Sequence, residues 1–343
     1  MRVPHGLRAA AGAGAGAGYS GDIAIAHDTS PYVSVYPWSS GFGTQYSDPA
    51  TLPAGNGNSV AFSPDGTTIA IAHDTSPYIS TYPWSSGFGT KYSDPATLPT
   101  GNGGGVAFSP DGANLAVAHN ASPRISVYPW SSGFGTKYSD PATVPTGNGN
   151  SVAFSPDGAN IAVAHVTTPF ISVYPWSSGF GTKYSDPSTL PAGTGNSVAF
   201  SPNGADIAVA HNTTPFLSVY PWSSGFGTKY SDPATLPANT GRGVAFSPDG
   251  TAIAVAHDTA PRISIYPWSS GFGTKYSDPA TLPVSNGNGV AFTPDGTAIA
   301  VIHFNSPRVS VYPWASGFGV KYSDPATEPT GAGNSVAFLP IEP

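Results

Sequence analysis

Hydrophobic positions in this chain alternate with small or polar ones in short runs, and the same order of runs returns again and again. Between residues 59 and 99 the runs are Val60 to Phe62, Ile69 to His73, Tyr78 to Pro83 and Thr90 to Ser93. Alternation over so few residues predicts β-strands, here named a to d in chain order. The Ser-Pro-Asp-Gly segment after strand a predicts a tight turn in which Gly66 adopts a positive φ.

Tryptophan marks the interval at which this unit recurs. Each tryptophan is 46 residues from the next, with no insertion or deletion, at Trp38, Trp84, Trp130, Trp176, Trp222, Trp268 and Trp314. The first copy lacks strand a, because Gly14 to Gly16 stand where Val60 to Phe62 stand in the next copy. The missing strand occurs at the other end, where Ser335 to Phe338 repeat strand a with no strand b after them. The two incomplete halves therefore complement each other.

This arrangement predicts an all-β fold, a seven-bladed β-propeller with four antiparallel strands per blade. The C-terminal strand a is expected to close the ring by joining the N-terminal strands b, c and d. Large and small residues alternate in strand b, as in Ile69 to His73, which predicts burial on both faces. Residues 19–343 form the predicted propeller domain. Residues 1–18 alternate Gly and Ala and predict a flexible leader, with a secretory signal as the alternative.

The Phe-Ser-Pro-Asp-Gly turn, followed by a strand, a short loop and an aromatic strand, resembles WD40-like propeller repeats over residues 19–343. That resemblance implies a protein-protein interaction scaffold. The chain departs from the family, because its Trp-Asp pair falls on Tyr36-Pro37 and its Gly-His before strand a is missing. The family's side-chain hydrogen-bond network therefore does not carry over. The whole unit is also similar to propeller repeats of phage and virus-like sequences, which implies a virion-associated or extracellular location.

Composition narrows the classes of partner. Charged residues make up 9% of the chain, and 12 Lys plus Arg against 19 Asp plus Glu give a net charge of -7. A nucleic-acid partner is disfavoured, because phosphates must be neutralised by clustered cations. Cysteine is absent, which removes thiolate metal ligands and thiol nucleophiles. No apolar run is long enough to span a bilayer. We expect a monomer without a cofactor and with a carbohydrate or protein partner.

The seven copies differ from one another mainly in the b–c loop and in the d–a connection. Strand direction alternates within a blade, so both segments emerge on the same face. The residue that opens strand c is always aromatic or Arg, the types that anchor interfaces. These residues are the predicted ligand-binding positions, with packing against the neighbouring blade as the alternative: Tyr32, Tyr78, Arg124, Phe170, Phe216, Arg262 and Arg308.

Two further rings of residues follow from the repeat. Strand b always ends in His, and we expect structural hydrogen bonds there, because equivalent residues of different blades lie too far apart to share a metal ion. The mouth of the central channel is expected near the residue before each strand a. Arg242 is the one charged residue of that set and is a candidate for binding a carboxylate or phosphate.

Catalytic motifs are absent from the sequence, and only two glutamates occur, Glu328 and Glu342. The sequence therefore predicts a non-enzymatic binding module. Attachment to a glycan or cell surface through the face with the b–c loops is the leading interpretation. A protein-protein scaffold and a structural ring without a specific ligand remain the alternatives.

Overall fold

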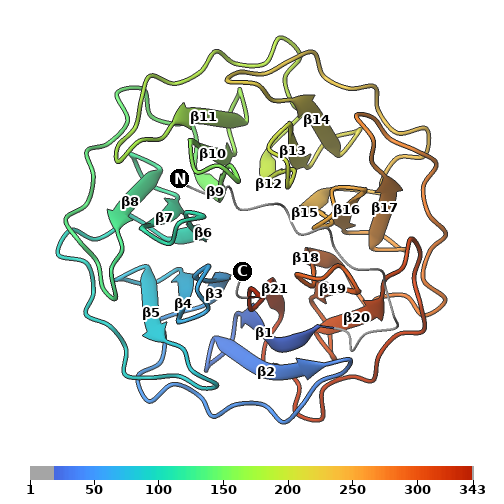
Figure 1. The fold of residues 1–343 in the computed structure, drawn as a ribbon, viewed down its shortest axis with the longest axis horizontal. Coiled ribbons are helices and arrows are strands. Elements are labelled where there is room, and N and C mark those ends of the chain that lie inside the picture. Colours follow the sequence, from blue (N-terminus) through green and yellow to red (C-terminus); the bar gives the residue numbers. More distant parts are fainter. Residues whose placement is uncertain (1–18, 342–343) are drawn as a thin grey trace, which may run out of the picture.

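The computed structural model describes residues 19–341, which form a ring of seven antiparallel sheets around a central channel (Figure 1). The all-β, seven-bladed propeller predicted from the repeat is confirmed. The predicted leader at residues 1–18 lies outside the described residues. The part of the chain that is described contains no helix long and apolar enough to cross a membrane.

Three strands make up every blade, and their sequence order follows the repeat. The inner strand lies beside the channel and the outer strand faces the rim (Figure 1). The strands are β1 (Ser20–His27), β2 (Val33–Ser39), β3 (Gly57–Phe62), β4 (Thr68–His73), β5 (Ile79–Pro83), β6 (Gly103–Phe108), β7 (Asn114–His119), β8 (Ile125–Pro129), β9 (Gly149–Phe154), β10 (Asn160–His165), β11 (Ile171–Pro175), β12 (Gly195–Phe200), β13 (Asp206–His211), β14 (Leu217–Pro221), β15 (Gly241–Phe246), β16 (Ala252–His257), β17 (Ile263–Pro267), β18 (Gly287–Phe292), β19 (Ala298–His303), β20 (Val309–Pro313) and β21 (Gly333–Phe338).

The ring is closed by its two ends. Strand β21 pairs antiparallel with β1, with Val336 opposite Ile25 and Ala337 opposite Ala24, so this blade has the order β2-β1-β21. Tyr19 adds a second link, because its backbone N donates to Asp295 in the neighbouring blade at 2.6 Å. The predicted joining of the C-terminal strand to the N-terminal strands is therefore confirmed.

The prediction of a fourth strand in each blade, placed around Thr90 to Ser93 in the second copy, is wrong. The outer segment makes one ladder-like backbone bond, from Tyr92 N to Thr81 O at 2.9 Å, and the sheet stops at β5. Pro95 follows closely and cannot donate a backbone hydrogen bond, which limits further pairing. The segment instead covers the outer edge of each sheet, and Tyr92 packs edge-on against Trp130 of the next blade.

The hydrophobic core lies between blades. Ala24 and Ala26 of β1 pack against Ile69 and Ile71 of β4 in the next blade, and all four side chains are fully buried. Small residues on one face of the middle strand let the adjacent sheet approach, while large residues on the other face fill the next gap. The alternation in strand b therefore sets the spacing of the blades, as expected from a strand buried on both faces.

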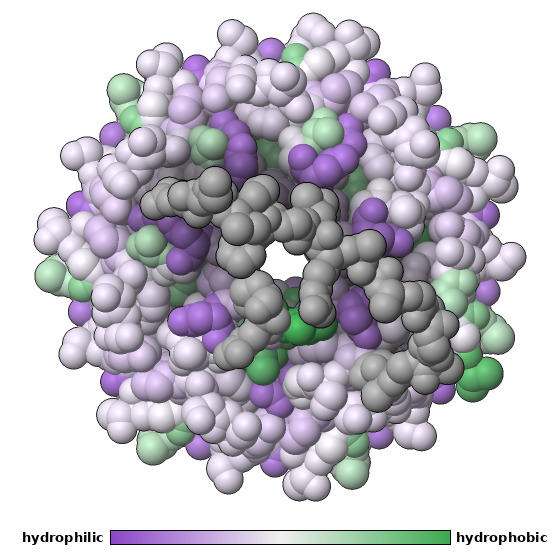
Figure 2. Space-filling view, viewed as in Figure 1, coloured by the Kyte–Doolittle hydropathy of each residue, from purple (hydrophilic) through white to green (hydrophobic). Residues whose placement is uncertain are grey.

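The loops divide between the two faces of the ring as predicted. Asp74 in the b–c loop donates its backbone N to Asn56 O in the d–a connection, so these segments lie together. The opposite face carries the Ser-Pro-Asp-Gly turns, where Gly66 has a φ of +69° as expected. In the view of Figure 2 the surface is polar over most of its area, and apolar patches are small and scattered.

Candidate functional site

A β-bulge at the start of each inner strand positions the candidate site. In β3, Gly57 pairs with His73 and Ser59 pairs with Ala72, which leaves Asn58 as the extra residue. A bulge of this kind redirects a side chain. Gly is needed before it, because a Cβ at Gly57 would collide with the Tyr32 carbonyl of the preceding blade. The equivalent extra residues are Gly104, Asn150, Asn196, Arg242, Asn288 and Asn334.

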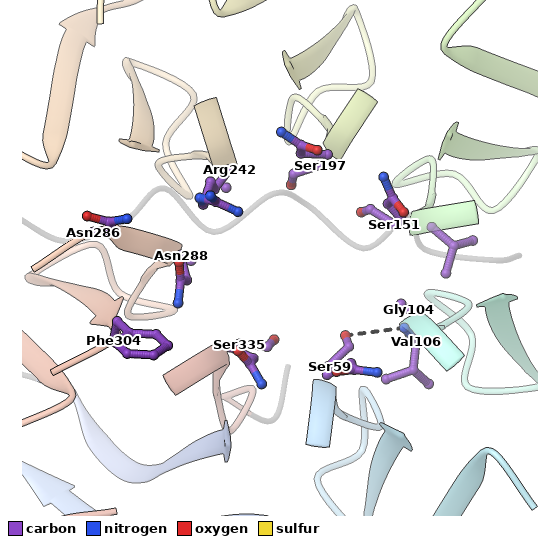
Figure 3. A pocket seen from close by; sticks show the side chains of 18 residues that line it. Ser59, Gly104, Val106, Ser151, Ser197, Arg242, Asn286, Asn288, Phe304 and Ser335 are labelled. Atoms are coloured by element: carbon purple, nitrogen blue, oxygen red, sulfur yellow. Dashed lines mark hydrogen bonds between the residues drawn. The ribbon is translucent and has the colours of Figure 1, made fainter. Parts of the chain in front are cut away.

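These seven bulge residues line one cavity of about 760 Å³ at the mouth of the channel, as the sequence predicted for them. Figure 3 shows labelled side chains from several blades directed toward the centre of the ring. The wall is polar, and sequence reasoning missed several of its members. The additional polar lining residues are Ser59, Ser151, Ser197, Asn286 and Ser335.

The asparagines of the cavity join neighbouring blades. Asn58 Nδ2 donates to Gly103 O at 2.8 Å, and four other asparagines repeat this contact, namely Asn150, Asn196, Asn288 and Asn334. Because the amide nitrogen is used in the ring, the amide oxygen remains as an acceptor toward the cavity.

Serines form a second layer below the asparagines. Ser59 Oγ accepts from Val106 N of the next blade at 3.3 Å, the contact drawn in Figure 3. The hydroxyl hydrogen of such a serine remains available to a ligand. The mouth therefore offers acceptors from the amides and donors from the hydroxyls, a combination that suits a ligand with several hydroxyl groups.

Arg242 breaks the uniform ring, since it stands where five copies have Asn. Its guanidinium makes two contacts to Asp258, from Nε to Oδ1 and from Nη2 to Oδ2, the latter at 3.0 Å. Within residues 19–341, Nη1 makes no hydrogen bond, so three of the five N–H groups, two on Nη1 and one on Nη2, remain for a ligand. Among the described residues, Asp258 is the carboxylate that is hydrogen-bonded to a residue lining the cavity.

Phe304 adds an apolar element to this polar mouth. Its side chain follows β19 and lines the cavity, although 58% of it is exposed. The equivalent positions in other copies hold Asp, Asn or Val. The signal was present in the sequence as a variable b–c loop, but the sequence did not show that this copy alone turns an aromatic ring toward the channel.

The predicted ligand-binding residues that open strand c lie away from this cavity. All seven have φ between +69° and +74°, are half-buried and do not line the cavity: Tyr32, Tyr78, Arg124, Phe170, Phe216, Arg262 and Arg308. The arginines contact the next blade's d–a connection, as when Arg262 Nη1 donates to Pro283 O at 3.2 Å. A direct role of these residues in ligand binding stays a prediction.

The histidines that end strand b have structural partners. His119 Nε2 lies 3.0 Å from Ser126 Oγ, and its Nδ1 lies 2.9 Å from Ala121 O. Burial lowers the pKa of His119 to about 4, so the imidazole is neutral at pH 7. None of these histidines lines the cavity.

No protein-family model and no curated protein sequence matches this chain. Solved structures share its fold. A 6-phosphogluconolactonase candidate from Bacteroides uniformis superposes with a TM-score of 0.69 at 16% identity, over 93% of this chain and 99% of the other. A second 6-phosphogluconolactonase candidate, from Bacteroides fragilis, superposes with a TM-score of 0.70 at 14% identity, over 93% of this chain and 98% of the other. The periplasmic gluconolactonase of Pseudomonas aeruginosa superposes with a TM-score of 0.67 at 17% identity, over 94% of this chain and 99% of the other.

These similarities change the functional interpretation. At such identities they establish the seven-bladed fold alone, but these three proteins are named as gluconolactonases or 6-phosphogluconolactonases and not as WD40, lectin or phage proteins. The prediction of a non-enzymatic binding module, with a glycan or a protein scaffold as its role, is therefore contradicted. The absence of contiguous sequence motifs is a weak argument against an enzyme, because a propeller site can be assembled from single residues of several blades.

Proposed function

We propose that this protein hydrolyses a sugar lactone at the mouth of its central channel. The observation that carries the proposal is the cavity itself, with a wall of amide and hydroxyl groups and one guanidinium, that of Arg242. The fold similarity to rings named as gluconolactonases and 6-phosphogluconolactonases supports the choice of reaction.

The reaction requires few groups from the protein. Water adds to the lactone carbonyl carbon, the ring C–O bond of the ester breaks, and the released oxygen takes a proton to become a hydroxyl. The new carboxylic acid then loses a proton to solvent, so each turnover releases one proton. Negative charge develops on the carbonyl oxygen during the attack, and a donor aimed at that oxygen lowers the barrier.

Arg242 is the residue suited to donate to that oxygen. Its contacts to Asp258 use Nε and Nη2 and fix the plane of the guanidinium, which leaves Nη1 directed to other partners. The serine and asparagine layers, for example Ser197 and Asn288, would hold the hydroxyl groups of the sugar. Asp258 acts here as a positioning residue.

A proton-release assay at constant pH tests the proposal, using D-glucono-1,5-lactone and its 6-phosphate with spontaneous hydrolysis subtracted. We expect catalysed hydrolysis of at least one of them by the purified protein. Arg242→Asn restores the residue that five copies carry and should reduce kcat/KM by about 10²-fold. Lys183→Asn removes the same charge from the outer segment and serves as the matched control, with unchanged activity expected.

Two results would overturn the proposal. One is the absence of acceleration on both lactones by a protein whose circular dichroism shows a folded β structure. The other is full activity in Arg242→Asn, because the cavity would then not be where the reaction occurs.

A further inference from the structure

One position of the d–a connection decides how the adjacent b–c loop lies. Five copies have Gly at this position, and a Cβ there would collide with the b–c loop of the same blade, for example at Gly55 against Asp74 and Thr75. The five are Gly55, Gly101, Gly147, Gly193 and Gly331. The two remaining copies have Asn239 and Ser285, in the neighbouring blades that begin with β15 and β18.

The change at Asn239 redirects Asp258. In the copy with Gly55, Asp74 Oδ1 accepts the backbone N of Asn56 at 3.0 Å. In the copy with Asn239, the side chain takes over this function, since its Oδ1 accepts Thr240 N at 2.7 Å. Its Nδ2 also donates to Thr259 Oγ1 at 3.0 Å. The equivalent aspartate, Asp258, is displaced from the cap and pairs with Arg242 instead.

Ser285 has the corresponding effect in the next blade. Its Oγ accepts a hydrogen bond from the backbone N of Asn305 at 2.7 Å and so contacts the b–c loop of this blade. Phe304, the residue before Asn305, lines the cavity. Figure 3 shows Phe304, Asn286, Asn288 and Arg242 along one side of the mouth. Two adjacent blades thus build one irregular wall on an otherwise repeating ring.

The charge balance of this wall distinguishes between substrates. Within residues 19–341, Arg242 is the one charged residue that lines the cavity, and Asp258 holds it in a two-point ion pair. The pair is neutral as a unit, and the protein as a whole carries a net charge of -7. A phosphate ester carries close to two negative charges at pH 7 and is bound in proteins by clustered cations and free backbone donors. The wall provides one cation that is already neutralised.

An uncharged sugar ring fits the same wall better. Hydroxyl groups can donate to the amide oxygens of Asn286 and Asn288, while Nη1 of Arg242 donates to the lactone carbonyl oxygen. The exposed ring of Phe304 offers a flat apolar surface for the C–H face of a sugar. We propose that the wall selects an uncharged sugar lactone over a phosphorylated one, an inference that rests on the lactonase function proposed above.

The test compares kcat/KM for D-glucono-1,5-lactone and its 6-phosphate in the wild-type protein and in variants. We expect the wild type to prefer the uncharged lactone by about tenfold or more, the scale of one charge interaction at a partly exposed site. Asp258→Asn leaves Arg242 with its full charge and should shift the ratio toward the phosphorylated lactone by about tenfold. Asp74→Asn changes the equivalent aspartate of another blade and should leave the ratio unchanged.

Asn239→Gly tests the positioning step separately. It restores the Gly of the other copies, so Asp258 can again cap the backbone N of Thr240, and the ratio should move in the same direction as in Asp258→Asn. Phe304→Ala should raise KM for the uncharged lactone with little change in kcat. A wild-type preference for the phosphorylated lactone, or an unchanged ratio in Asp258→Asn, would overturn the inference.

Binding of non-hydrolysable sugars separates this inference from the lactonase function. Calorimetric titration with D-glucose and D-glucose 6-phosphate measures charge selectivity without any reaction. Stronger binding of D-glucose supports the selective wall, whereas stronger binding of the phosphate overturns it. If neither lactone is hydrolysed but D-glucose is preferred, the proposed reaction fails while the charge selectivity of the wall stands.

Discussion

Strand β21 is joined to the rest of its blade by pairing and packing, whereas every other inner strand continues through a tight turn into its middle strand. Phe338 is the main apolar anchor of β21 and is 8% exposed. Its ring lies edge-on to Tyr19 and Trp38, with centroid distances of 5.7 and 6.1 Å. We therefore predict that Phe338→Ala releases β21 locally without unfolding the other blades.

The size of the effect follows from the lost packing. Truncating a buried Phe to Ala costs about 3 to 5 kcal/mol. Each 1.4 kcal/mol changes an equilibrium about tenfold, so the opening of β21 should become about 10² to 4 × 10³ times more frequent. The matched control is Phe292→Ala. Phe292 is also 8% exposed and lies 5.8 Å from Trp314, but a tight turn ties its strand to β19.

Hydrogen exchange measured by mass spectrometry on peptides that cover β1 and β21 provides the assay. In Phe338→Ala these peptides should exchange faster by the factor above, while peptides from β9 and β10 keep their wild-type rates. In Phe292→Ala the peptides of β18 and β19 should change much less. Equal local exchange at both altered blades, or uniform acceleration around the ring, would refute the idea that closure is the weak point.

Two further predictions concern stability. Burial lowers the pKa of six strand-end histidines to about 4, so the folded protein binds fewer protons than the unfolded chain between pH 6.5 and 4. The contribution of these histidines to the free energy of unfolding is fully present above pH 6.5. It falls by about 1.4 kcal/mol per pH unit for each histidine as the pH drops from 6.5 toward 4. Tm values measured at pH 7 and pH 5 check this prediction, and equal values would contradict it. Asp206 accepts from Trp268 Nε1 at 3.0 Å and from Tyr230 OH at 2.9 Å, so Asp206→Ala should lower the free energy of unfolding by about 2 to 4 kcal/mol in urea titrations. The exposed Asp186→Ala should change it by less than about 1 kcal/mol, and a similar loss in both variants would argue against the buried network.

Regular features of the ring were predictable because each copy carries the same local signals. The interval between tryptophans and the unpaired halves at the two ends are sufficient to predict seven blades and their closure. Gly66 was placed correctly because a tight turn requires positive φ there. The outer strand was predicted wrongly, because the alternation in Thr90 to Ser93 is typical of a strand. The segment makes only a single ladder-like hydrogen bond to β5.

The site was only partly predictable. Arg242 was singled out as the one charged residue of its set, and it lines the cavity as expected, although it lies within β15 and not before it. The bulge that aims it into the channel was not visible, since it depends on Gly241 pairing with His257 and Gly243 with Ala256 in the folded sheet. Phe304 was missed, because the sequence does not show that its loop, which Ser285 contacts at Asn305 N, lies at the mouth of the channel.

By itself the sequence determined the number of blades, the closure by β21 and the face on which the copies differ, because periodic patterns of burial and turn residues act within each copy. Only the tertiary structure decided which variable residues meet. Residues equivalent to Arg242 come from every blade, and closing the ring brings them to one cavity. Asn239 and Ser285 contact the b–c loops that carry Asp258 and Phe304 at this mouth. Such contacts depend on collisions and hydrogen bonds between loops, which no repeat pattern encodes.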